Sequence, residues 1–130
     1  MGACYYVKLK VNVINETGAI NALNEYISKS TYVNFSLDKY AAQGITTDTF
    51  DDLMKIFLAG WKHQELVIEK RQMYTYYSND FDASYGWESV MMDMFEVITP
   101  YISDGSEILI YPDNDYDRLV VRNGECIQTH

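Results

Sequence analysis

The stretch at residues 5–13 reads YYVKLKVNV, and apolar residues alternate with polar ones along it. Successive side chains of a strand point to opposite sides, so the two faces of this stretch differ in character. One face would carry Tyr5, Val7, Leu9, Val11 and Val13. The other would carry Tyr6, Lys8, Lys10 and Asn12. The pattern predicts a half-buried strand over residues 5–14.

Three later segments have apolar residues at the three- and four-residue spacing of an amphipathic helix. The first is predicted over residues 17–29, behind the capping side chains of residues 15–18. The second is capped by Thr46, Thr47 and Asp48 and would stop at Gly60. Its inward side would hold Phe50, Leu53, Met54, Phe57 and Trp61. The third starts at Ser84 and ends before Pro100, because proline lacks the N–H that a helix interior needs.

Further strands are predicted between and after these helices. Residues 65–77 are rich in β-branched and aromatic types, and Ser78-Asn79-Asp80 would close that strand. Residues 107–111 and 117–122 form a hairpin, and Asn123-Gly124 is a strong two-residue turn into a last strand at 125–128. Residues 32–37 mix alternation with loop residues and could form a short edge strand.

The order of these elements favours one fold class. Helices come early and hairpins late, which argues against a doubly wound parallel sheet. We predict an α+β fold, with an antiparallel sheet of four to five strands and about three helices packed mainly on one face. A length of 130 residues with 48% hydrophobic content is that of one ordinary domain, so residues 1–130 are expected to form a single domain.

The charge of the chain is distributed unevenly. Residues 1–79 carry eight acids and eight bases, whereas residues 80–130 carry eleven acids against Arg118 and Arg122, which accounts for the formal net charge of −9. Such a field repels nucleic acid and anionic membranes and attracts basic protein surfaces. No direct nucleic-acid or membrane binding is therefore expected. With no signal-peptide pattern and no long apolar run, we predict a cytoplasmic protein in which Cys4 and Cys126 are separate thiols.

Candidate contact residues lie in the acidic half. On the third helix, positions 100° apart place Glu88, Met92 and Glu96 on the solvent side. Methionine on a charged face is either an adaptable contact or an isolated exposed apolar residue, and both interpretations remain open. The terminal hairpins and the turn before them supply the other candidates, which are Asp104, Glu107, Asp113, Asp115, Tyr116 and Asp117.

The run Asp113-Asn114-Asp115-Tyr116-Asp117 has the carboxylate spacing with which a calcium loop begins. Such a loop needs glycine at its sixth position and glutamate at its twelfth, where this chain has Arg118 and Gly124. An Asp-rich turn is the better account, because Asp and Asn bond their own backbone. We therefore predict no metal site and no cofactor.

Twelve tyrosines and few catalytic side chains complete the inventory. Half of the strand tyrosines must point away from the core, where they suit either a protein interface or cross-strand packing. His63 and His130 are the only histidines, and no catalytic or phosphate-binding motif occurs. The prediction is that the chain is not an enzyme. The alternative is a small-ligand-binding or enzymatic α+β domain with a pocket between helices and sheet.

In size, acidity and lack of catalytic motifs the chain resembles the small phage-encoded inhibitors of bacterial defence, the anti-CRISPR and anti-restriction type. The resemblance implies an interaction protein that binds and inhibits a basic, nucleic-acid-binding protein through nucleic-acid mimicry, since carboxylates compete with phosphates for the same Lys and Arg side chains. An immunity protein against a basic nuclease toxin would use the same charge logic. The sequence makes no prediction of the oligomeric state.

Overall fold

The computed structural model describes residues 2–31, 33–59, 66–111 and 116–129. Their elements are β1 (Gly2–Val11), α1 (Glu16–Lys29), α2 (Leu37–Ala41), α3 (Phe50–Leu58), β2 (Val67–Lys70), β3 (Thr75–Ser84), α4 (Trp87–Ile98), the 3₁₀ turn η1 (Thr99–Tyr101), β4 (Glu107–Tyr111), β5 (Asp117–Arg122) and β6 (Glu125–Thr129). The predicted α+β class is confirmed. The sheet has six strands where four to five were expected, and four α-helices are present where about three were expected.

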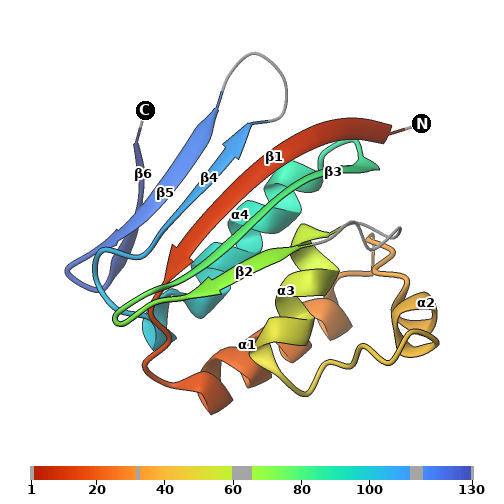
Figure 1. Cartoon of the computed structure of the whole chain (residues 1–130), viewed down its shortest axis with the longest axis horizontal. Coiled ribbons are helices and arrows are strands. Elements are labelled where there is room, and N and C mark those ends of the chain that lie inside the picture. Colours follow the sequence, from red (N-terminus) through yellow and green to blue (C-terminus); the bar gives the residue numbers. More distant parts are fainter. Residues whose placement is uncertain (1, 32, 60–65, 112–115, 130) are drawn as a thin grey trace.

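The six strands form one antiparallel sheet in the order β2-β3-β1-β4-β5-β6. The sheet curls into a half-barrel, and the helices lie on one side of it, with α4 running along the sheet (Figure 1). The opposite side carries no helix among the residues that the structure describes. We call that side the open face.

Strand β1 occupies the middle of the sheet, as its alternating sequence requires. Its inward residues Tyr5, Val7, Leu9 and Val11 are at most 1% exposed. On β4, Ile110 stands opposite Val7 and Ile108 stands opposite Leu9, and both isoleucines are fully buried. The helices close this layer with apolar residues from α1, α3 and α4.

The strand predicted over residues 65–77 is wrong. The chain turns between β2 and β3, where the backbone N–H of Arg71 donates to the carbonyl of Tyr74. Ser78, Asn79 and Asp80 do not close a strand but lie inside β3. The polar residues 78–80 resemble a turn in the sequence, but Asn79 is buried inside the strand. Its side-chain amide can be buried there because it donates to the Leu58 carbonyl at 3.0 Å. Its two neighbours point away from the core.

Two further boundaries differ from the sequence prediction. Helix α4 begins at Trp87 rather than Ser84, because the chain reverses at Gly86 with a φ of 87°, a conformation that suits glycine. Residues 33–36 form no strand, and the short α2 follows them. Here Phe35 is buried between Tyr26, Phe57 and Trp87. The predicted contribution of Trp61 and the stop at Gly60 lie outside the described residues.

The cap predicted for the second helix, Thr46 or Thr47 with Asp48, is wrong, because α3 begins at Phe50 and Thr49 caps it by accepting the backbone N–H of Asp52 at 3.1 Å. Local signals for other boundaries are confirmed. Asn15 caps α1 by accepting the backbone N–H of Gly18 at 3.0 Å. Asn123 and Gly124 both have positive φ, 53° and 77°, as a type I′ hairpin turn requires. The expected separate thiols are also found, because neither Cys4 nor Cys126 forms a disulfide in the described structure.

A polar contact joins α3 to the β2–β3 hairpin. The Tyr77 hydroxyl donates to Asp51 at 2.7 Å, and the Lys70 ammonium lies 3.0 Å from the other carboxylate oxygen. Burial raises the pKa of Asp51, but the Tyr77 hydrogen bond and Lys70 outweigh it, so the pKa is below its ordinary value. A carboxyl with a lowered folded-state pKa stabilises the fold above its unfolded pKa and loses that contribution as the pH falls.

Asp51→Asn is therefore expected to lower the melting temperature at pH 7, and its deficit is expected to shrink as the pH falls through the lowered pKa of Asp51. Thermal melts of both proteins across this pH range test the expectation. Asp48→Asn, at an exposed position near the start of α3, is the control and should show no such difference. If Asp51→Asn lowers the melting temperature by the same amount at all pH values, ionisation of Asp51 is not the source of the stability.

Candidate functional site

The nine residues predicted to bind a partner do not form one surface. Glu107 alternates with the buried Ile108 and Ile110 and lies on the open face. Asp117 stands opposite Ile110 and therefore lies on the helix side. Helix α4, with its three candidates, is also on the helix side (Figure 1). Asp113 and Asp115 lie outside the described residues.

Two of the predicted contact acids are engaged within the chain. The Arg118 guanidinium binds one carboxylate oxygen of Glu107 through Nη2 at 2.6 Å and Nε at 3.1 Å. The Asp104 carboxylate accepts the backbone N–H groups of Asn123 at 2.9 Å and Gly124 at 3.0 Å. Glu107 is thus neutralised by its neighbour, and Asp104 holds the β5–β6 turn.

The α4 candidates are less exposed than helical periodicity suggested. Met92 is half-buried and packs against the core, so it is not the isolated exposed methionine of the sequence prediction. Glu88 is half-buried beside Tyr5, where burial raises the tyrosine pKa to about 12 and the Glu88 carboxylate adds to the rise. Glu96 is exposed. Burial raises the pKa of the Cys126 thiol, and the nearby Glu96 adds to that rise.

A row of tyrosine rings crosses the open face where β1 begins. Tyr6 and Tyr111 stand opposite each other on neighbouring strands, with ring centroids 5.7 Å apart, and Tyr116 continues the row at 5.6 Å from Tyr111. Tyr6 is 41% exposed and Tyr111 is 40% exposed. We call Tyr6, Tyr111 and Tyr116 the tyrosine row. The cross-strand packing considered from the sequence therefore occurs, and because Tyr6 and Tyr111 still face solvent, their use at a protein interface stays a prediction.

Two carboxylates flank the tyrosine row. Asp80 stands opposite Tyr6, and Asp82 stands opposite Cys4, whose Sγ donates to its carboxylate at 2.9 Å. Neither aspartate takes part in an ion pair with another described residue. The sequence from residue 72 to residue 117 contains no lysine or arginine. We call Asp80, Asp82 and the tyrosine row the acidic half of the open face.

Sequence reasoning missed Asp80, Asp82, Tyr6 and Tyr111 as surface candidates. A detectable signal was present, because Tyr6 was predicted on the polar face of its strand and alternation continues through residues 76–84. The misplaced strand end at residues 78–80 concealed it. Only the cross-strand register brings the two aspartates beside the tyrosines.

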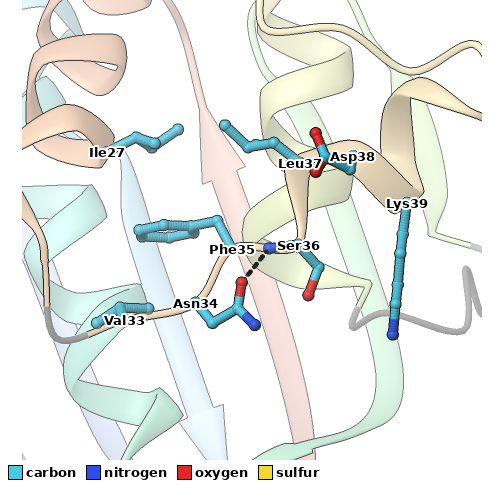
Figure 2. A pocket seen from close by; sticks show the side chains of 8 residues that line it. All are labelled: Ile27, Val33, Asn34, Phe35, Ser36, Leu37, Asp38 and Lys39. Carbon is cyan, nitrogen blue, oxygen red and sulfur yellow. Dashed lines mark hydrogen bonds between the residues drawn. The ribbon is translucent and has the colours of Figure 1, made fainter.

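A hollow of about 420 Å³ lies over the segment that leads into α2. Figure 2 shows Ile27 and Leu37 pointing toward each other across it, with Phe35 beside them. The Asn34 carboxamide oxygen accepts the Ser36 backbone N–H at 2.9 Å, which fixes the bend. Two neighbouring hollows, of about 270 and 330 Å³, share Asn34. The charged side chains at the hollow of Figure 2 are Asp38 and Lys39, both on exposed residues.

Two other properties of the described residues bear on the site. They contain no group of three or more His, Cys, Asp or Glu side chains placed to hold a metal ion. None of their helices is both long enough and apolar enough to cross a bilayer. Comparison of the chain with protein-family models, with curated proteins and with solved structures finds no match.

The role of Asp104 predicts a loss of stability on truncation. Asp104→Ala leaves the N–H groups of Asn123 and Gly124 without their carboxylate acceptor. We expect the free energy of unfolding to fall by about 1–2 kcal/mol, measured by denaturant titration. Asp48→Ala is the matched control and should change it by less than about 0.5 kcal/mol. An unchanged stability of Asp104→Ala would show that water replaces the carboxylate fully.

Proposed function

We propose that this chain is a non-enzymatic, acidic interaction protein that binds and inhibits a basic, nucleic-acid-binding protein through the acidic half of its open face. The observation that carries the proposal is the exposed tyrosine row with Asp80 and Asp82 beside it, two carboxylates that form no ion pair with another described residue.

The chemistry of this half suits lysine and arginine. Carboxylates pair with both, and bind arginine through two hydrogen bonds where the geometry allows. The faces of tyrosine rings attract the same cations through the ring quadrupole. Tyrosine also contributes a large contact area with few rotatable bonds, so its burial at an interface costs little conformational entropy. A surface that binds phosphates offers both kinds of contact.

The charge of the whole chain supports the same partner class. A formal charge of −9 on 130 residues steers a basic protein toward the chain and repels nucleic acid. Competition with phosphates for one set of cations would inhibit the partner without any chemical step. This is the mode of action implied by the resemblance to small anti-defence inhibitors.

The test is capture from an extract of cells that encode the chain, with the wild type and with Asp80→Lys/Asp82→Lys as baits. We expect the wild type to retain a basic nucleic-acid-binding protein, identified by mass spectrometry, and the variant to retain at least about tenfold less. Free duplex DNA should compete for that partner. Added wild-type chain should weaken the binding of the purified partner to nucleic acid.

Asp38→Lys/Asp48→Lys is the control bait, because it changes the net charge equally at exposed sites outside the open face. It should retain the partner. The proposal fails if the acidic-half variant captures the same protein as strongly as the wild type, or if the captured partner binds nucleic acid unchanged in the presence of the chain.

A further inference from the structure

The open face is electrically balanced, although the chain is not. Its described residues include five acids and five bases by strand register and ring contacts. The acids are Glu69, Asp80, Asp82, Glu107 and Glu125. The bases are Lys8, Lys10, Arg71, Arg118 and Arg122. Half of the ten cations in the chain therefore lie on this one face.

The two signs are partly separated along the strands. From the beginning of β1 toward its end, the first row holds Cys4 and Asp82, and the second holds Asp80 with the tyrosine row. All five bases come after these rows, together with the other three acids. The third row holds Lys8 and Arg118, the fourth holds Lys10 with Glu69 and Glu107, and the last holds the remaining two arginines with Glu125. Glu69 pairs with Arg71 and Glu107 with Arg118, so bases exceed acids by two in this region. We call this second region the cationic half.

Part of the cationic half remains available for contacts. Lys8 is exposed and forms no ion pair with another described residue. The Lys10 ammonium lies 4.5 Å from the centre of the Tyr74 ring, and Arg71 lies 5.2 Å from that of Tyr76. These internal contacts already show that cations of this face pair with tyrosine rings. A hollow of about 460 Å³ is lined by Lys10, Arg118 and Arg122 together with the acids Asp104 and Glu107.

We propose that the open face binds the open face of a second copy of this chain, with the strands of the two copies antiparallel. A two-fold axis that crosses the strands between the second and third rows places each second row over the partner copy's third row. In this arrangement Tyr6 of one copy lies over Lys8 of the other copy. Tyr116 lies in the same way over Arg118, and Tyr111 over Leu109. The first row of one copy likewise faces the fourth row of the other copy. This brings Asp82 near Lys10 of the other copy, and Asp80 comes near Lys8 of the other copy.

The dimensions of the face are adequate for such a dimer. The four rows hold 18 described open-face residues, and 18 positions at about 4.8 Å by 6.7 Å give roughly 580 Å² per copy, so the total of about 1,150 Å² exceeds the ~1,000 Å² expected of a biological interface. Because charged pairs make up much of the contact, the association should weaken as salt screens them. The second copy would occupy the acidic half, so self-association would compete with the basic partner proposed above.

The test is sedimentation velocity of the full-length chain alone, over a range of concentrations and between about 0.05 M and 1 M salt. We expect a concentration-dependent dimer at low salt that dissociates at high salt. Asp80→Lys/Asp82→Lys and Lys8→Glu/Lys10→Glu should each dimerise at least about tenfold more weakly, because each places like charges opposite one another. An equimolar mixture of the two variants should restore a heterodimer, since every reversed pair is again attractive.

Asp38→Lys/Asp48→Lys serves as the charge-matched control and should dimerise at low salt. Circular dichroism checks that each variant is folded. If a double variant does not fold, the single change Lys8→Glu replaces it in the test. A wild type that is monomeric at every concentration, or variants that dimerise as strongly as the wild type, would overturn the inference. A monomer that still captures a basic partner would overturn this inference alone, and a dimer that captures none would overturn only the proposed function.

Discussion

Burial of one face of β1 is the constraint on which the rest of the structure depends. β1 pairs with β3 along its whole length and with β4 along half of it, and its four inward side chains are almost completely buried. A slip of one residue would turn all four into solvent, so the register is fixed by apolar burial. Tyr6, Lys8 and Lys10 are then forced onto the open face. The surface for which binding is proposed is thus the reverse side of the sheet that covers the hydrophobic core.

The same register redistributes the charge of the chain. Counted along the sequence, the excess of acids belongs to the second half. On the described residues of the open face five acids meet five bases, so the formal charge of −9 is carried by the remaining residues. A protein can therefore repel nucleic acid as a whole and still present a face with an acidic end and a region in which bases outnumber acids. The binding proposed for this face depends on which strand each charge occupies more than on the total charge.

The elements that were predicted well are those whose causes are local. Alternation of apolar and polar residues predicted β1, and helical spacing with an Asn cap predicted α1. Asn123-Gly124 predicted the β5–β6 turn, and each of these signals lies within a few neighbouring residues of the sequence. The errors occurred where a distant residue satisfies a polar group. Asn79 looks like a turn residue, yet its amide is bonded to Leu58, twenty-one positions away. Glu107 looks like a free surface acid, yet Arg118 on the adjacent strand neutralises it.

The sequence by itself determined the α+β class, the faces of β1 and the excess of negative charge, because periodicity and composition are properties of neighbouring residues. The tertiary structure alone decided which acids are available for contact. Asp104 was assigned to a turn and Glu107 to an ion pair, while Asp80 and Asp82 were placed beside tyrosines from two other strands. The physical reason is that cross-strand register is set by burial summed over the whole sheet, and no local stretch encodes it.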